Sequence, residues 1–345
     1  MLVLGPKDSG KTTIVRTLAN YAIRQQETPI IINLDPSEGM TVVPGTISAT
    51  TFSKPLNAQD GFLSYSLLES NGIIDYPLVY HYGYLSPSDQ PSLYKKVVKS
   101  LADSIEKQLS LSPKYSKSGF IIDTSDQIDH SNYQLLQDII ADFKVDRILV
   151  VDNERLFSDF NKMYSQNQSV SVAKVPKSGG VSNNIIYSSI ISFFFSQFNF
   201  LLFPIHTPLP PFYLMNLSPL FFITKESLAP SSTLPIGQVR QVSETQITKV
   251  EVDEKLSHML IAVLQLDSQK PSVLPPQQQK EEEKEEEAVE SLQIDESSII
   301  NSPVLGYINI TLVDMKASHL VVLSPAPGRI PEKVLLAGEI QWIDS

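Results

Sequence analysis

The chain of 345 residues contains no cysteine. This absence excludes a disulfide-stabilised secreted module, a thiol nucleophile and a cysteine-ligated zinc site. Basic residues are also scarce, since 27 Lys and Arg stand against 38 Asp and Glu, and the formal net charge is -11. A basic surface over the whole body, of the kind that holds nucleic acid by its phosphates, is therefore not expected. The first residues lack the basic and long apolar regions of a signal peptide, so we expect none.

The charge is distributed unevenly. Residues 277–296 hold eight Glu, one Asp and two Lys, a net charge of -7, which leaves -4 of the total -11 for the rest of the chain. We predict a disordered acidic insertion over residues 268–298, because so polar a segment buries too little apolar area to offset its ordering entropy. By contrast, the 47 residues of segment 178–224 carry no charged side chain and include nine of the 15 Phe.

Apolar runs alternate with amphipathic patterns in the first part of the chain, which predicts an α/β fold with a parallel sheet covered by helices on both faces. We divide the chain into a nucleotide-binding domain over 1–177, an uncharged lid or linker over 178–226, and a second domain over 227–345. In the second domain an amphipathic run covers 257–266. The predicted strands are 2–4, 29–34, 119–123, 147–152, 170–175, 304–313 and 319–323, and the predicted helices are 12–25, 92–109 and 133–143.

One motif carries clear chemistry. Residues 5–12, GPKDSGKT, match G-x-x-x-x-G-K-[ST] between a predicted strand and a predicted helix, which is the context the motif requires. In such a P-loop the backbone amides surround phosphate, Lys11 neutralises phosphate oxygens and the Thr12 hydroxyl binds Mg²⁺. The alternative is a glycine-rich turn without a ligand. We predict that ATP is bound by Gly5, Lys7, Asp8, Ser9, Gly10, Lys11, Thr12 and Thr13.

Two carboxylates follow predicted strands. Asp35 comes after PIIINL, and Asp123 ends GFIID. Ligands of open α/β sheets lie at the carboxyl ends of strands, where a carboxylate holds magnesium or accepts a proton during phosphoryl transfer. Helix capping is an equally good interpretation of each aspartate.

Seven segments occur in an order that resembles the eukaryotic polynucleotide (RNA) 5′-hydroxyl-kinase family, most closely its fungal branch in pre-mRNA cleavage factor IA. They cover about 1–180 and 228–345. The segments are GPKDSGKTT, INLDPSEGMTVVPGTISAT, PLVYHYG, IDTS, VDNERLF, VPKSGGV and LSPAPGRIP.

The resemblance implies a P-loop NTPase core between an N-terminal β-sandwich and a small C-terminal α/β domain. It implies a nuclear role in pre-mRNA cleavage and polyadenylation, with a docking surface for the large scaffold subunit that reads the polymerase tail. It also assigns ATP and Mg²⁺ as ligands. Asp35 matches the general base of the active kinases, Asp123 matches a Walker-B-like strand end, and Lys11 and Thr12 take the phosphate and magnesium roles.

The sequence departs from this family in three places. The chain starts four residues before Gly5, without the β-sandwich, and Gln127 stands where active kinases have an RNA-clasping tryptophan. The lid arginines of the family are missing, because segment 178–224 contains no arginine. Since such arginines stabilise charge on the transferred phosphoryl group, we expect no effective kinase turnover and interpret Asp35 as a vestigial base.

The uncharged segment allows other interpretations. Residues 185–203 have about the length of a membrane span, but Ser, Gln and Asn dilute them and no basic flank adjoins them. We therefore expect no membrane span, and a hydrophobic partner surface remains an alternative to an altered lid. His81, Lys177 and Arg155 are weaker candidates, for which structural or surface roles are the simpler interpretation.

The expected function is that of an ATP-binding subunit of the nuclear pre-mRNA 3′-end cleavage machinery. In this interpretation the nucleotide is mainly structural and RNA is contacted indirectly. Two alternatives stay open: an active RNA 5′-hydroxyl kinase, and a truncated, non-functional fragment.

Overall fold

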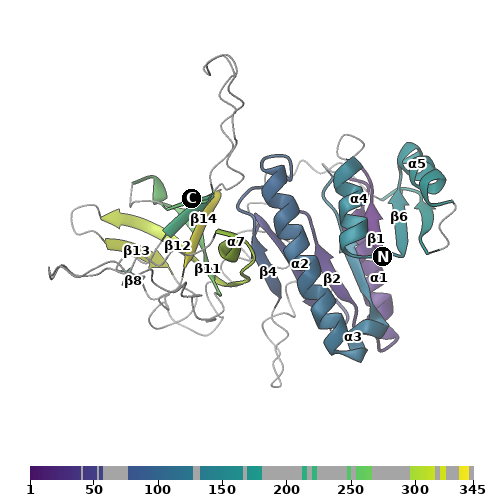
Figure 1. The fold of residues 1–345 in the computed structure, drawn as a ribbon, viewed down its shortest axis with the longest axis horizontal. Helices are drawn as coiled ribbons and strands as arrows, with labels where there is room; N and C mark the ends of the chain where they lie inside the picture. The colour runs from purple at the N-terminus through teal and green to yellow at the C-terminus, as the bar shows by residue number, and fades with distance from the viewer. Residues whose placement is uncertain are drawn as a thin grey trace, which may run out of the picture.

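The computed structural model describes thirteen stretches of the chain, and it places two seven-stranded sheets side by side (Figure 1). The described residues are 1–39, 42–52, 54–56, 77–126, 133–165, 169–180, 212–215, 220–223, 247–249, 254–265, 296–314, 319–323 and 334–341.

The first sheet has the strand order β4-β3-β2-β5-β1-β6-β7. The four neighbouring pairs in the series β2-β5-β1-β6-β7 are parallel. Strand β3 pairs antiparallel with β2 and with β4. The strands are β1 (Leu2–Leu4), β2 (Ile30–Asn33), β3 (Thr46–Thr51), β4 (Leu78–His81), β5 (Phe120–Asp123), β6 (Arg147–Val151) and β7 (Ser171–Val175).

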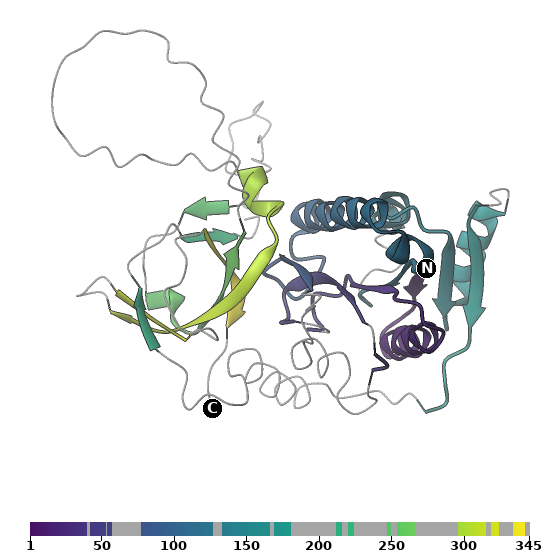
Figure 2. The same ribbon diagram turned by 90° about the horizontal axis from the view of Figure 1, so that it is seen from below.

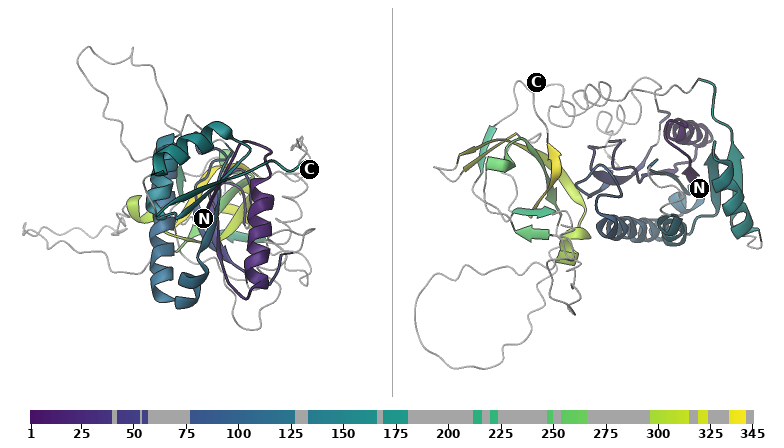
Figure 3. Two further views of the ribbon diagram at one scale, coloured as in Figure 1. Left: turned by 90° about the vertical axis from the view of Figure 1, so that its right-hand side faces the viewer. Right: turned by 90° about the horizontal axis from the view of Figure 1, so that it is seen from above.

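Helices cover both faces of this sheet (Figures 2 and 3). Helix α1 lies on one face, and α2 and α4 lie on the other. Alternation along the strands explains this: on β1, Val3 packs in the cluster with α1, whereas Leu2 and Leu4 pack in the cluster with α2 and α4. The helices are α1 (Lys11–Arg24), α2 (Pro91–Leu111), α3 (Pro113–Ser118), α4 (Tyr133–Asp142) and α5 (Glu154–Tyr164).

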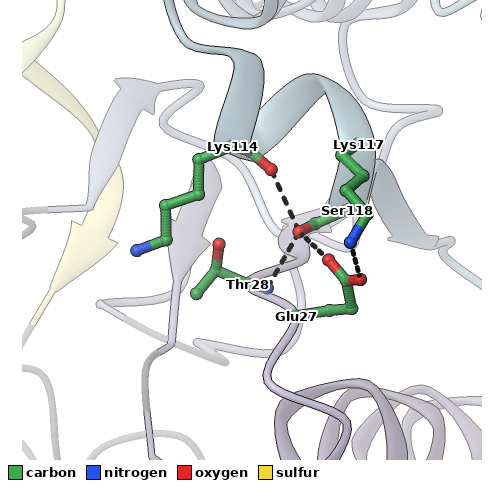
Figure 4. Close-up of polar contacts among 5 residues, drawn as sticks. All are labelled: Glu27, Thr28, Lys114, Lys117 and Ser118. Atoms are coloured by element: carbon green, nitrogen blue, oxygen red, sulfur yellow. Dashed lines mark hydrogen bonds and ion pairs between the residues drawn. The ribbon is translucent and has the colours of Figure 1, made fainter.

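Helix α3 is fastened to the loop between α1 and β2 (Figure 4). Lys117 forms a 2.8 Å ion pair with Glu27, and the backbone N–H of Thr28 donates to the Ser118 hydroxyl at 3.0 Å. The same hydroxyl lies 2.8 Å from the second carboxylate oxygen of Glu27. These contacts gather at the end of the sheet where β2 and β5 begin.

The second sheet is mostly antiparallel, in the order β10-β9-β14-β11-β12-β13-β8, and only the β14–β9 pair is parallel. Every residue of β11 is buried, so this strand forms its centre. Its elements are β8 (Phe212–Met215), β9 (Leu220–Ile223), β10 (Ile247–Lys249), the 3₁₀ turn η3 (Glu254–Leu256), β11 (Met259–Leu264), α7 (Glu296–Ile300), β12 (Val304–Asp314), β13 (His319–Leu323) and β14 (Leu335–Gln341).

One hydrophobic cluster runs through both halves of the molecule. It joins residues of the first sheet, such as Tyr80 of β4, to Leu260, Leu336 and Ile340 of the second. The backbone N–H of Glu339 donates to the carbonyl of Gly83 at 2.9 Å, which ties β14 to the chain just after β4. Because the apolar surface is continuous, the two sheets share a core and are expected to unfold cooperatively.

His81 belongs to this junction. It is buried, and its Nδ1 lies 3.4 Å from the Tyr307 hydroxyl on β12. Burial lowers the pKa of the imidazole to about 4. The described surroundings of His81 therefore support the structural role that the sequence analysis favours for this histidine.

Glycines allow the two backbones to meet. A Cβ atom on Gly338 would lie 2.4 Å from Cα and 2.5 Å from the carbonyl oxygen of Gly83. A Cβ on Gly45, where φ is +76°, would lie 1.8 Å from a methyl group of Ile340. Backbone atoms cannot yield as a side chain can, so the Gly338–Gly83 contact requires glycine at position 338.

The expected α/β class is confirmed, with helices on both faces of a P-loop sheet, although β3 and β4 make that sheet mixed. Within the amphipathic run predicted at 257–266, residues Met259–Leu264 form strand β11, and all six of its side chains are buried. The segment assigned to a lid or linker, 178–226, contributes β8 and β9 to the second sheet. The domain boundaries themselves stay a prediction.

The acidic insertion lies outside the described residues except for 296–298, which begin α7 rather than continue the insertion, because Ile299 anchors this helix in the core. The apolar stretch 185–203 and Gln127 also lie outside them. Within the described parts of the chain, no helix is both long and apolar enough to cross a membrane.

We predict that Gly338→Ala lowers the free energy of unfolding by about 2–3 kcal/mol, because the new methyl group forces the two backbones apart. Urea denaturation measures this change. Gly306→Ala on β12, which β11 separates from β14 in the same sheet, is the matched control, since a Cβ there meets nothing within 4 Å. Equal stability of the two variants would show that the junction tolerates a side chain.

Candidate nucleotide-binding site

The loop that leaves β1 has the backbone geometry of a phosphate cradle. Gly10 precedes α1 with φ 87°, and Asp8 has φ 53°, so both adopt the left-handed conformation. A Cβ atom on Gly5 would lie 2.8 Å from the carbonyl oxygen of Val151, which excludes larger residues there. Glycine is thus required at position 10 by the positive φ and at position 5 by the lack of space for a Cβ atom.

The start of α1 is open to an anion. Among the described residues no side chain caps this helix, so the amide groups of its first turn keep their hydrogen atoms available. A helix N-terminus also carries positive potential, which favours a phosphate group at this place.

The side chains of Lys11 and Thr12, which follow Gly10 in the motif, both donate hydrogen bonds within the site. Lys11 is buried, and its Nζ donates to the carbonyl oxygen of Pro6 at 3.1 Å. The Thr12 hydroxyl donates to Glu38 Oε2 at 3.2 Å. Both groups therefore lie at the mouth of the loop, where phosphate and magnesium ligands are needed.

The other predicted ATP-binding residues of the loop differ in how far their side chains are exposed to solvent. Ser9 is buried, and among the described residues its hydroxyl has no hydrogen-bond partner. Lys7 and Thr13 are exposed, and Asp8 is half-buried. A backbone cradle requires the amides of these residues rather than their side chains, so exposed side chains are compatible with their predicted roles.

Both predicted carboxylates reach the same edge of the sheet. Asp123 ends β5, and its Cα is paired with Val3 of β1 and with Asn33 of β2. Asp35 lies two residues beyond the end of β2. Parallel pairing therefore brings the P-loop and the two aspartates together, as the sequence analysis predicts.

The side chain of Asn33 shapes the loop that carries Asp35. Its Oδ1 accepts from the backbone N–H of Asp35 at 2.9 Å, and its Nδ2 donates to the carbonyl of Glu38 at 2.9 Å. Asp35 in turn accepts from the N–H and the hydroxyl of Ser37, at 2.9 and 2.7 Å. This network fixes Asp35 and Glu38 on one side of the P-loop.

Burial shifts the protonation of both aspartates. It raises the pKa of Asp35 to about 6, while the hydrogen bonds from Ser37 act in the opposite direction. It raises the pKa of Asp123 to about 7, and the negative charges of Glu38 and Asp35 add to that effect, whereas the Thr12 hydroxyl and Lys11 oppose it. The site thus holds carboxylates that lack enough positive charge of their own.

The surroundings of Asp123 test most directly whether these residues fit a cation. It is 1% exposed, and neither carboxylate oxygen has a well-formed hydrogen bond among the described residues. A buried carboxylate without partners is costly, and a divalent cation beside Thr12 and Asp123 removes that cost. These residues therefore fit Mg²⁺.

The described side chains of the protein do not by themselves form a complete set of metal ligands. Within the described residues, no group of three His, Cys, Asp or Glu side chains could hold a metal ion. Mg²⁺ is commonly bound through one or two side chains, water and substrate phosphates, so a nucleotide is expected to complete its coordination.

The sequence analysis missed three residues of the site: Arg16, Asn33 and Glu38. Burial lowers the pKa of Arg16, while the charges of Glu38 and Asp123 act against that shift. A helical signal was present for Arg16, which lies four residues after Thr12 and thus on the same face of α1. For Asn33 and Glu38, the available signal in the sequence was that both are polar residues close to the candidate Asp35, one before it and one after it.

The weaker candidates have ordinary structural surroundings. Arg155 is exposed on the first turn of α5, which begins after Asn153, whose Oδ1 accepts from the N–H of Leu156 at 3.0 Å. Lys177 follows β7 at the edge of the sheet, two strands away from β1. No catalytic role is assigned to either residue.

Comparisons with known proteins agree with this geometry. The family model for the mRNA cleavage and polyadenylation factor CLP1 P-loop matches residues 5–189, and that for the pre-mRNA cleavage complex II protein Clp1 matches residues 210–344. The Protein CLP1 homolog of Dictyostelium discoideum is 32% identical over 363 residues, covering 100% of this chain and 68% of that protein. The polyribonucleotide 5′-hydroxyl-kinase Clp1 of Danio rerio is 30% identical over 351 residues, covering 100% and 72%.

Two solved structures have a similar fold. Wild-type Clp1p in complex with residues 454–563 of Pcf11p has a TM-score of 0.77 and 24% identity, covering 100% of this chain and 74% of that one. A second structure, with a TM-score of 0.76 and 23% identity, covers 99% and 75%, and it concerns an extended interface between Pcf11p and Clp1p and ATP loss in a point mutant.

We predict that Asp123→Asn stabilises the ligand-free protein increasingly as pH rises. The folded-state pKa of about 7 exceeds the unfolded value near 4, so the folded wild type binds the extra proton at low pH and loses this stability through pH 7. Asparagine carries no charge, so the wild type loses stability relative to the variant from about pH 4 up to pH 7, and the advantage of the variant should grow by about 2–3 kcal/mol between pH 5 and pH 8.

Urea denaturation at pH 5 and pH 8, without nucleotide or divalent cations, measures the difference. The exposed Asp103 on α2 supplies the control Asp103→Asn, which should show no such pH dependence. A constant difference between wild type and Asp123→Asn at both pH values would contradict a buried, uncompensated charge.

Proposed function

Because the chain belongs to the Clp1 family, we propose that it is an ATP- and Mg²⁺-binding subunit of the nuclear pre-mRNA 3′-end cleavage machinery. The observation that carries the proposal is the buried carboxylate of Asp123 beside Thr12, which has no well-formed hydrogen bond among the described residues. A nucleotide–magnesium complex supplies the positive charge that this carboxylate lacks and the phosphates that the open helix end favours.

In this proposal the nucleotide serves mainly as a structural ligand. Lys11 would bind phosphate oxygens, the amides of the loop would surround them, and Thr12 and Asp123 would hold Mg²⁺. A ligand that binds only the folded state stabilises it by mass action. The cleavage of pre-mRNA itself is then a property of the assembled machinery rather than of this site.

The proposed partner is the large scaffold subunit of cleavage factor IA, which binds the polymerase tail. The similarity to Clp1p solved with Pcf11p supports this assignment. The subunit would contact RNA indirectly, through the assembly. The low net charge outside the acidic segment, -4, is compatible with such a role but offers no broad basic surface for RNA.

We expect Mg²⁺–ATP to raise the melting temperature of the wild type, since saturation at about 100 times Kd adds about 2.7 kcal/mol. Lys11→Ala should lose most of this shift, because it removes the charge that faces the phosphates. Thermal denaturation with and without Mg²⁺–ATP measures it, and Lys107→Ala, an exposed lysine of α2, is the control. Absence of any shift in the wild type would support the alternative of a non-functional fragment.

An active RNA 5′-hydroxyl kinase remains the second candidate, because Asp35 has a raised pKa of about 6 and lies beside the P-loop. A base of this kind is suited to accept a hydroxyl proton near neutral pH. Against it stands the absence of arginine in 178–224.

We expect phosphate transfer from labelled ATP to a 5′-hydroxyl oligonucleotide to be at the level of a no-enzyme reaction, because no lid arginine stabilises the transferred group. Asp35→Asn and Lys11→Ala proteins are the controls. Robust transfer that both substitutions abolish would replace the structural role by a catalytic one.

A further inference from the structure

Glu38 connects the loop after β2 with the first turn of α1. Its backbone carbonyl is held at 2.9 Å by Asn33 Nδ2, and its carboxylate accepts the Thr12 hydroxyl at 3.2 Å. The side chain is exposed, although its backbone is fixed. Glu38 is therefore a charged group that is hydrogen-bonded to the proposed magnesium ligand Thr12.

The same carboxylate influences the other charged groups of the site. Its negative charge contributes to the raised pKa values of Asp35 and Asp123, and it favours the charged form of Arg16. Glu38 thus lies close enough to add a third negative charge to the two buried aspartates.

The positive charge near these carboxylates is limited. Lys11 donates to the carbonyl of Pro6, and Arg16 lies among Glu38 and Asp123. A triphosphate brings further negative charge to a site where, among the described residues, the carboxylates of Asp35, Glu38 and Asp123 lie near Lys11 and Arg16. Phosphate without a metal is therefore repelled, and a divalent cation is needed to balance the charges.

We propose that Glu38 makes nucleotide binding at this P-loop dependent on a divalent cation. The inference rests on the proposed nucleotide-binding function and extends it to the regulation of the same site. Glu38 has two effects: its charge opposes metal-free phosphate, and its hydrogen bond to Thr12 turns the lone pairs of that hydroxyl toward the cation. Both effects raise the ratio of the nucleotide Kd measured without metal to the nucleotide Kd measured with Mg²⁺.

The buried side chain of Asp123 gives independent support. It is 1% exposed, and its two oxygens lack well-formed hydrogen bonds among the described residues. Its negative charge would therefore be stabilised by a bound cation. Glu38, in the loop after β2, accepts the Thr12 hydroxyl, and Asp123, at the end of β5, is near enough to both residues for them to influence its pKa. A cation between them would bind all three groups.

The test compares wild type with Glu38→Gln, which keeps the shape and an acceptor for Thr12 but removes the charge. ATP and ADP affinities are measured by calorimetry in EDTA and in Mg²⁺. We expect the ratio of the EDTA Kd to the Mg²⁺ Kd to fall by about tenfold in Glu38→Gln, through tighter metal-free binding and slightly weaker Mg²⁺-dependent binding. Stabilisation by Mg²⁺ alone, from thermal denaturation, should also decrease.

Two further variants make the result specific. Glu38→Asp retains the charge and should keep a ratio close to that of the wild type. Glu106→Gln removes an exposed carboxylate of α2 that pairs with Lys144, and it should leave the ratio unchanged.

The outcomes separate this inference from the proposed function. If wild type binds Mg²⁺–ATP and Glu38→Gln keeps the full wild-type ratio, Glu38 does not couple the cation to the nucleotide and the inference fails alone. If the wild type binds no nucleotide even with Mg²⁺, both the proposed function and the inference are overturned.

Discussion

Parallel pairing of β1 with β5 and of β5 with β2 is the constraint on which the site depends. It places the C-terminal ends of three strands at one edge, so that the P-loop, Asp35 and Asp123 meet although they are far apart in sequence. Alternation along the same strands buries their side chains against helices on both faces. Burial at that edge leaves the aspartates poorly solvated, and this raises their pKa values.

The second sheet is tied to this arrangement through backbone contacts and a shared hydrophobic cluster. Gly338 approaches Gly83 closely, Glu339 donates to the Gly83 carbonyl, and a common hydrophobic cluster crosses the junction. The strand β4 lies between the junction and the strands that carry the site. Changes in the second sheet thus have a packed path to the first, since close-packed interiors transmit strain.

The site combines an open helix end, which favours anions, with carboxylates that disfavour them. Lys11 and Arg16 balance part of the negative charge of Asp35, Glu38 and Asp123. In the proposed function, phosphate and a divalent cation would complete the balance by binding together, and this links the proposed structural nucleotide to the inferred role of Glu38. The same charges explain why a functional site lowers the stability of the ligand-free protein.

The sequence alone predicted much of this protein, because its signals are local. Motif spacing identified the loop from Gly5 to Thr12, and apolar runs identified the strands that end at Asp123 and before Asp35. Periodicity predicted α1, α2 and α4 to within a few residues. Helix and strand patterns depend on neighbouring side chains, so they are readable before folding.

Tertiary structure determined what local patterns do not contain. The antiparallel strands β3 and β4, the strand at β11 where an amphipathic run was expected, and the contact of Gly338 with Gly83 all depend on partners distant in sequence. The partnership of Glu38 with Thr12 likewise arises only when the loop after β2 is folded onto α1. The sequence therefore predicted candidate groups such as Lys11, Thr12 and Asp123, whereas packing determined their burial, charge and partners, since desolvation and Coulomb interactions depend on distance in space.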